Sequence, residues 1–241
     1  MINTIMFDLD GTLLQFSQKE FISVYFAELS KVFIRLGLDA EKAVAAVWAG
    51  TKAMVLNDGS VLNVERFWQV FGKYMDMTGE RLSTVEAACD SFYTNEFNAA
   101  KSVMIPCDVS APLVRTMAAR GYDVVLATNP LFPLCAVESR LGWIELDKND
   151  FLLITHYSNS NFCKPNPGYY REVLEKIGKK PEQCIMIGNN PGEDMIAAEL
   201  GIETFLVTDC LENEANIDIS GYRQGTLAEL AAYLVFRLAN N

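Results

Sequence analysis

Five short runs of apolar residues recur along the chain, and within each run the apolar residues are continuous. Runs without polar alternation are typical of strands that are buried on both faces, as in a parallel sheet covered by helices. The sequence therefore predicts five parallel strands, at residues 4–7, 124–127, 151–155, 184–187 and 204–207.

The segments between these runs have the apolar spacing of amphipathic helices. Several of them end at a glycine, which readily ends a helix. Alternating strands and helices predict an α/β fold with a Rossmann-like, doubly wound parallel sheet. Core helices are expected at residues 110–120, 134–141, 168–177 and 193–200.

One long segment breaks this alternation. Between the first two predicted strands the apolar residues keep a helical spacing, which indicates an inserted all-α module. We expect an α/β core domain of residues 1–14 and 106–241, and a helical domain of residues 15–105. The helical stripes lie at residues 21–36, 40–48, 64–74 and 82–97, with turn-forming residues at 57–60.

Composition and charge narrow the possible functions. The 241 residues include 20 Lys and Arg, 31 Asp and Glu and one His, a formal net charge of −11. That balance disfavours a nucleic-acid-binding surface, and one histidine excludes a histidine-centred metal cluster. Six cysteines without a CxxC pair suit buried thiols in a reducing compartment. Neither a signal peptide nor a membrane span is predicted, so we expect a cytoplasmic protein.

Two carboxylates follow the first predicted strand, at Asp8 and Asp10, and Gly11 then lets the chain turn away. Ligands of doubly wound sheets bind outside the carboxyl ends of the strands. In an extended segment the two side chains project to the same side, where they must share a proton or a cation. The pair is therefore a candidate catalytic centre.

The other strand ends supply complementary groups. Thr128 and Asn129 follow the second strand and offer a hydroxyl and an amide to phosphate or carboxylate oxygens. Lys164 lies in a loop that two prolines stiffen, before a helix. The fourth strand runs into a glycine-rich acidic loop at residues 188–194.

The order of these motifs resembles the haloacid dehalogenase superfamily, in its branch of phosphatases with a helical cap inserted after the first motif. The resemblance implies the strand order 5-4-1-2-3 and a small-molecule phosphate ester as substrate. It also implies that Asp8 is the nucleophile and Asp10 the general acid and base. Thr128 and Asn129 would bind the phosphoryl oxygens, and Lys164 would neutralise the nucleophile and the phosphate.

The resemblance further implies a Mg²⁺ ion, held by Asp8, by the backbone carbonyl of Asp10 and by the acidic loop. Where the family most often has a GDxxxxD loop, this chain has Asn189 and then Asp194. An amide oxygen can ligate Mg²⁺ without adding charge, so a weakened metal site is expected, with Asn189 and Asp194 as candidate ligands.

Two other functions remain open. Metal-independent dehalogenases of the superfamily also use an Asp nucleophile but typically lack the second Asp, so Asp10 favours phosphoryl transfer. Asn189 leaves room for a catalytically weak relative with a binding or regulatory role. Substrate choice is expected to lie in the cap, with candidate contacts at Gln15, Phe16 and residues 52–60, while Trp48, Phe67 and Trp68 are expected to pack in the cap core.

Overall fold

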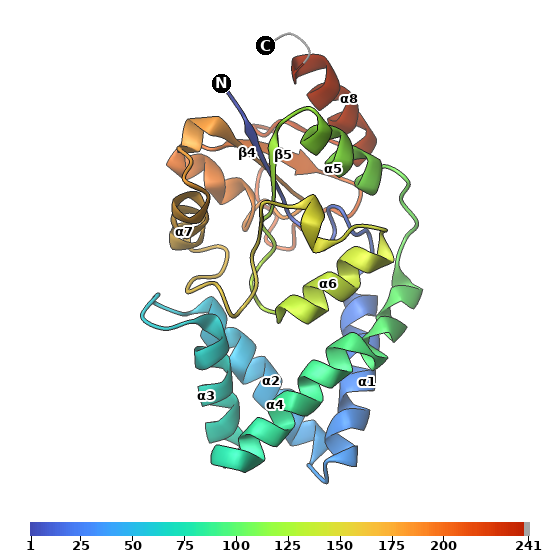
Figure 1. Ribbon diagram of the computed structural model, residues 1–241, viewed down its shortest axis with the longest axis vertical. Helices are drawn as coiled ribbons and strands as arrows, with labels where there is room; N and C mark the ends of the chain where they lie inside the picture. Colours follow the sequence, from blue (N-terminus) through green and yellow to red (C-terminus); the bar gives the residue numbers. More distant parts are fainter. Residues whose placement is uncertain (239–241) are drawn as a thin grey trace.

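The computed structural model describes residues 1–238, and these form a twisted parallel sheet with helices on both faces and a helical region at one end (Figure 1). The six strands lie in the order β3-β2-β1-β4-β5-β6. The strand order 5-4-1-2-3 is therefore confirmed, with one strand added at the β5 edge. The strands are β1 (Thr4–Phe7), β2 (Asp123–Leu126), β3 (Leu153–Ile154), β4 (Cys184–Gly188), β5 (Glu203–Val207) and β6 (Gln224–Gly225).

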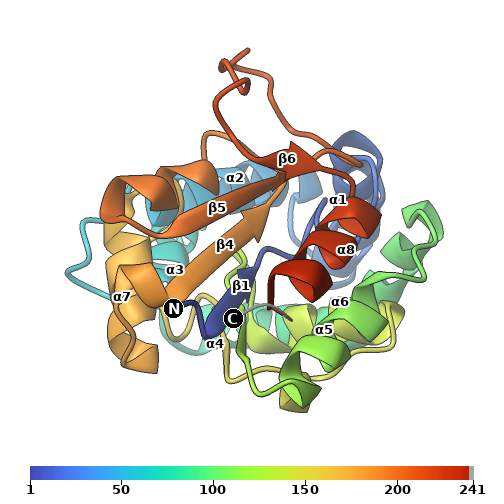
Figure 2. The same ribbon diagram turned by 90° about the horizontal axis from the view of Figure 1, so that it is seen from above.

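The central strand β1 is fully buried, because helices cover both faces of the sheet (Figure 2). Thr4 is paired with Asp123 of β2 on one side and with Cys184 of β4 on the other. This parallel register brings the carboxyl ends of β1, β2 and β4 to one edge of the sheet. Around the sheet lie α5 (Ser110–Ala119), α6 (Leu134–Trp143), η2 (Lys148–Asp150), α7 (Pro167–Ile177), η3 (Pro181–Gln183), η4 (Met195–Leu200) and α8 (Leu227–Leu238).

The helix predicted at residues 193–200 is instead the short 3₁₀ helix η4. Two hydrogen bonds to the backbone carbonyl of Asn190 fix the turn before this helix. The backbone N–H of Asp194 donates at 2.8 Å and that of Glu193 at 3.3 Å. The helix then ends at Gly201, whose φ of 87° is left-handed. Only six residues remain between these two fixed points, and 3₁₀ geometry is common in such short pieces.

The segment between β1 and α5 is helical throughout most of its length, and it lies beyond the carboxyl edge of the sheet (Figure 1). The predicted break at residues 57–60 falls between its second and third helices. The helices are α1 (Gln18–Arg35), α2 (Ala40–Val55), α3 (Asn63–Met75), α4 (Gly79–Thr94) and η1 (Glu96–Val103).

The chain enters and leaves this helical region at neighbouring points. Phe16 and Met104 form an antiparallel bridge, and the backbone N–H of Ile105 donates to the carbonyl of Gln15 at 2.8 Å. The predicted domain boundaries at 15 and 105 lie at this crossing. The division into an α/β core domain and a helical cap domain stays a prediction.

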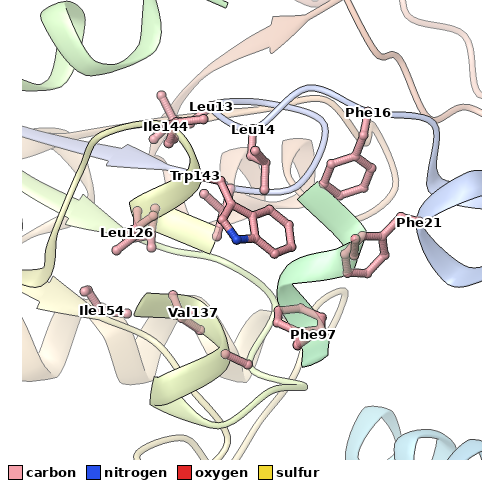
Figure 3. Close-up of a cluster of buried hydrophobic side chains, with 14 of the residues drawn as sticks. Leu13, Leu14, Phe16, Phe21, Phe97, Leu126, Val137, Trp143, Ile144 and Ile154 are labelled. Carbon is pink, nitrogen blue, oxygen red and sulfur yellow. The ribbon is translucent and has the colours of Figure 1, made fainter. Parts of the chain in front are cut away.

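Apolar side chains of the helical region and of the sheet form one continuous cluster. Figure 3 shows Phe21 and Phe97 of the helical region on one side of Trp143 of α6, with Leu126 of β2 on its other side. Trp143 also donates its indole N–H to Asn98 Oδ1 at 2.7 Å. The helical region is therefore packed against the sheet layer.

A second contact joins the start of α3 to the loop before Lys164. Asn63 is fully buried, and its side-chain amide nitrogen donates to the carbonyl of Phe162 and to Cys163 Sγ, both at 3.3 Å. Its backbone N–H donates to the carbonyl of Ser160 at 2.9 Å. The helical region thereby holds the loop that carries Lys164.

Within residues 1–238, none of the helices has both the length and the apolar character that crossing a membrane requires. All six cysteines are free thiols, and Cys89, Cys163 and Cys184 are buried. A cytoplasmic location stays a prediction.

Candidate active site

The predicted site residues come together at the carboxyl edge of the sheet. A cavity of about 120 Å³ opens there beneath the helical region. Lys164 does not line this cavity, but its Nζ donates to Asp8, which does. The predicted residues that line the cavity are Asp8, Asp10, Thr128, Asn129, Asn189 and Asp194.

Asp8 leaves the end of β1 with only 7 % of its surface exposed. Its Oδ1 accepts a hydrogen bond from Lys164 Nζ at 2.8 Å, and its Oδ2 accepts one from the Thr12 hydroxyl at 3.4 Å. Burial raises the pKa of Asp8, Lys164 opposes that rise, and the nearby Asp194 carboxylate adds to it. The cation of Lys164 is therefore what favours the ionised, nucleophilic form of Asp8 among the described residues.

Lys164 is a buried cation held between two carboxylates. Its Nζ donates to Asp194 Oδ1 at 2.6 Å as well as to Asp8. Burial lowers the pKa of Lys164, but the two carboxylates outweigh burial, so its pKa lies well above the ordinary value. Lys164 is thus an ammonium ion whose charge is directed at Asp8.

Asp194, a predicted metal ligand, has both carboxylate oxygens engaged. Oδ1 accepts from Lys164, and Oδ2 accepts from the backbone N–H of Asn190 at 2.9 Å. The carboxylate also packs on Gly188, where a Cβ atom would lie 2.1 Å from Asp194 Cγ. The geometry places Asp194 as a partner of Lys164, and a metal ion could bind it only by displacing one of these contacts.

Asn189 occupies the other predicted metal position, and it is buried beside the first motif. Its Oδ1 accepts from the Thr12 hydroxyl at 3.1 Å, while its Nδ2 donates to the carbonyl of Cys210 at 2.7 Å. Gly11 makes this approach possible, because its φ is 81° and a Cβ atom there would lie 2.1 Å from Asn189 Nδ2. The contact fixes the amide with its oxygen toward Thr12.

The oxygens around Thr12 suit a hard divalent cation. The Thr12 hydroxyl is within hydrogen-bonding distance of both Asp8 Oδ2 and Asn189 Oδ1. A charged and a neutral oxygen therefore lie close together beside Thr12. Mg²⁺ prefers such oxygen ligands and commonly uses one or two carboxylates. Among the described residues no group of three His, Cys, Asp or Glu side chains has metal-binding geometry, so Mg²⁺ would also need a carbonyl or water.

Asp10 forms an ion pair between its Oδ2 and Nη1 of Arg140, a contact that was not expected from the sequence. Arg140 comes from α6 and is fully buried, with its guanidinium 4.5 Å from the centre of the Phe132 ring. The other oxygen, Asp10 Oδ1, is buried without a hydrogen-bond partner among the described residues. The sequence does contain a signal for this contact, because Arg140 is a charged residue on the otherwise apolar stripe of its helix, one turn after Ala136.

Thr128 and Asn129 differ in their freedom to bind a substrate. The Thr128 hydroxyl makes no hydrogen bond within the described residues, although its backbone carbonyl accepts from Thr155 Oγ1 at 2.6 Å. The Asn129 amide is fully used, since its Oδ1 accepts from the Lys164 N–H at 3.2 Å and its Nδ2 donates to Glu193 at 3.0 Å. Asn129 therefore braces the Lys164 loop.

Two further carboxylates, Glu193 and Glu212, line the same cavity. Burial and the charge of Glu193 raise the pKa of Glu212 to about 7. Glu193 stands in the acidic loop that the sequence pointed to. Glu212 follows β5, and no local pattern connects it with the site.

The residues of the helical region that were predicted to contact the substrate do not line this cavity. Gln15, Phe16 and residues 52–60 do not line this cavity, whereas Gln18 of α1 does. Trp48, Phe67 and Trp68, expected in the cap core, line a second cavity next to Asp10.

Comparison with known proteins identifies one matching family model and two partial relatives. A family model described as haloacid dehalogenase-like hydrolase matches residues 2–201. Flavin mononucleotide hydrolase 1 of Arabidopsis thaliana is 29 % identical over 108 residues, which are 42 % of this chain and 38 % of that protein. Acyl-CoA dehydrogenase family member 10 of Mus musculus is 26 % identical over 99 residues, 41 % of this chain and 9 % of that protein. The chain thus spans well under half the length of either relative.

Solved structures with the same fold include a phosphatase and a dehalogenase. The HAD phosphatase of Thermococcus onnurineus has a TM-score of 0.60 and 17 % identity, over 97 % of this chain and 98 % of that one. The L-2-haloacid dehalogenase of Xanthobacter autotrophicus has a TM-score of 0.51 and 14 % identity, over 98 % and 88 %. At these identities the likeness shows the fold alone.

Proposed function

Since the chain belongs to the haloacid dehalogenase-like hydrolase family and is therefore a hydrolase, we propose that it hydrolyses small phosphate monoesters through an aspartyl-phosphate on Asp8. The observation that carries the proposal is the placement of Asp8 and Asp10 in one cavity, with Lys164 bound to the first and Arg140 to the second. The two carboxylates differ in their free oxygens, because both oxygens of Asp8 accept hydrogen bonds whereas Asp10 Oδ1 has no partner among the described residues.

In the first step Asp8 attacks phosphorus, so that a new bond forms from its carboxylate oxygen while the bond to the ester oxygen breaks. Burial raises the pKa of Asp8 well above its ordinary value, and the Lys164 cation opposes that rise and so favours the ionised form. Lys164 also offsets the negative charge of the phosphoryl oxygens. The free Thr128 hydroxyl lines the same cavity and can donate to one of those oxygens.

Asp10 is the proposed proton donor in the first step and the proton acceptor in the second. Its Oδ2 is fixed by Arg140, and its Oδ1 is buried and unpartnered, which is unfavourable until a proton or a hydrogen-bonding group meets it. We assign to Oδ1 the proton that passes to the leaving alcohol oxygen. In the second step the same oxygen takes a proton from the water that attacks the aspartyl-phosphate and releases phosphate.

Mg²⁺ is the cofactor that we propose for this site, with Asp8, the backbone carbonyl of Asp10 and Asn189 as the residues that would hold it. When bound, Mg²⁺ supplies positive charge to the phosphoryl oxygens. Asp194 acts in this scheme through Lys164, which it keeps directed at Asp8. The helical region is proposed to act as a cap that keeps water from the cavity.

The test is phosphate release from p-nitrophenyl phosphate with Mg²⁺, by the wild type and by Asp8→Asn. We expect the substitution to abolish turnover, because an amide is not a nucleophile of this kind. Asp58→Asn is the matched control, since Asp58 is exposed and does not line the cavity. Turnover that persists in Asp8→Asn would remove the aspartyl-phosphate from the mechanism.

Asn189 supports one second candidate, a weakly catalytic protein that binds phosphate esters. No phosphate release from a broad panel of phosphoesters, together with measurable binding of one of them, would favour that alternative. Halide release from 2-haloacids would favour a dehalogenase instead, although Asp10 has no evident use in halide displacement.

A further inference from the structure

The second cavity lies inside the helical region and is lined mostly by aromatic side chains. It has a volume of about 130 Å³ and extends between α1, α2, α3 and the sheet edge. Its aromatic wall includes Phe21, Tyr25, Trp48, Phe67, Trp68 and Phe132.

This cavity adjoins the catalytic one at the proposed acid. Asp10, Gln18 and Phe132 line both cavities. An ester oxygen that receives its proton from Asp10 therefore lies at the shared boundary. The carbon atoms attached to that oxygen would extend away from Asp8, into the aromatic cavity.

The lining selects an apolar leaving group. The Tyr25 and Tyr93 hydroxyls are hydrogen-bonded to each other, with 2.8 Å between their oxygens, which uses one of the two O–H groups. Trp68 Nε1 is a lining donor that is buried without a partner among the described residues. The hydroxyls of a sugar would lose their hydrogen bonds to water here and find few replacements, which is unfavourable. An aromatic ring instead gains edge-to-face contacts of the kind already present between Phe67 and Trp68, whose ring centres lie 5.0 Å apart.

The volume limits the size of that group. An apolar cavity of about 150 Å³ in a protein interior holds one benzene ring. The present cavity of about 130 Å³ therefore suits one ring and is too small for a system of three fused rings such as a flavin.

We propose that the substrates of this enzyme are phosphate monoesters of small alcohols that carry a single aromatic ring, with the ring held in the aromatic cavity. The inference rests on the proposed phosphatase activity. In the reaction, the bond from phosphorus to the ester oxygen breaks, the oxygen takes the Asp10 proton, and the arylalkyl alcohol leaves.

The experiment compares benzyl phosphate with propyl phosphate and glycerol 3-phosphate. All three release a primary alcohol, so intrinsic reactivity differs little and the ratio of kcat/KM reports the cavity. We expect benzyl phosphate to be favoured by at least about 50-fold, within the range known for apolar pockets. Anthracenylmethyl phosphate, with three fused rings, should be a poorer substrate than benzyl phosphate.

Thr51→Phe is the variant that fills the cavity, because Thr51 lines it from α2. We expect the benzyl-to-propyl ratio of kcat/KM to fall by at least about tenfold, by the same pocket argument. Leu56→Phe is the control, since Leu56 directly follows the same helix, is 71 % exposed and does not line the cavity. A general folding defect would lower both rates and leave the ratio unchanged.

The outcomes separate the two proposals. Turnover of all three esters without a preference for benzyl phosphate would overturn the aromatic cavity as a binding site and leave the phosphatase intact. If no ester is turned over, the proposed function fails. Calorimetry with benzylphosphonate and propylphosphonate then decides the cavity, because equal binding of the two would overturn it and tighter benzylphosphonate binding would support it.

Discussion

Removal of the Arg140 guanidinium tests the contact that no sequence pattern connected with the site. Arg140→Leu keeps the helix and much of the packing on Phe132 but leaves Asp10 without its cation. Loss of one partner from a fully buried ion pair costs about 3–5 kcal/mol. Arg140 is fully buried and the Asp10 side chain is 24 % exposed, so Asp10 recovers part of its hydration. We therefore expect a loss of about 2–4 kcal/mol in the free energy of unfolding.

Urea unfolding and thermal unfolding measure this loss. For a chain of this size, about 3 kcal/mol corresponds to a Tm lower by roughly 6–12 °C. Arg115→Leu is the matched control, because Arg115 is 54 % exposed and its nitrogen lies 3.5 Å from Asp150, a surface pair worth at most about 1 kcal/mol.

A double variant separates the lost charge pair from lost packing. Asp10→Asn combined with Arg140→Leu removes the uncompensated charge and should recover part of the stability lost in Arg140→Leu. If the double variant is no more stable than Arg140→Leu, or if Arg140→Leu costs less than about 1 kcal/mol, the ion pair does not have the role assigned to it.

Three further predictions concern the metal ligand, the contact at α3 and the acidic cavity. Asn189→Asp adds a charged oxygen and should tighten Mg²⁺ at least about tenfold in calorimetric titration, and equal affinities would argue against position 189 as a ligand. Asn63→Leu removes the side-chain bonds to the Lys164 loop and should raise KM more than it lowers kcat, whereas an unchanged KM would contradict a role for this contact in holding that loop. The pKa of Glu212 is raised to about 7 from an ordinary 4.5, so between these pH values the folded protein keeps a proton that the unfolded chain has released. The free energy of unfolding therefore declines as the pH rises from 4.5 to about 7. In urea unfolding without divalent metal, Glu212→Gln should flatten that decline, and an unchanged slope would refute this assignment.

The sheet and the first motif were predictable because local pattern and topology agree there. The apolar run at residues 4–7 coincides with β1, since both faces of that strand are buried. The carboxyl ends of parallel strands share one edge, so the meeting of Asp8 with the 188–194 loop followed from the strand order that the resemblance implied. The two-residue strand β6 is too short to leave a pattern.

Other parts of the site depend on contacts that a sequence pattern does not encode. Arg140 lies on an apolar helix stripe, but only the fold shows that Asp10 faces it. The residue type of Asn129 pointed to a ligand, yet its amide is taken up by Lys164 and Glu193. Glu212 reaches the cavity through a loop after β5. In each case the role of the residue depends on its contacts with side chains that are distant in the sequence.

The charges of the site connect the amide at position 189 with the proposed cation. The described cavity and its direct contacts hold five carboxylates and two cations, an excess of three negative charges when all are ionised: Asp8, Asp10, Glu193, Asp194 and Glu212 against Arg140 and Lys164. A phosphate monoester adds about −1.5 to −2. Repulsion on that scale in a partly buried cavity favours binding of a divalent cation together with the ester. An Asp at position 189 would attract the cation more strongly but would also repel an ester that arrives without it. Asn189→Asp should therefore bind inorganic phosphate more weakly than the wild type when Mg²⁺ is absent, and this difference should shrink or reverse at saturating Mg²⁺.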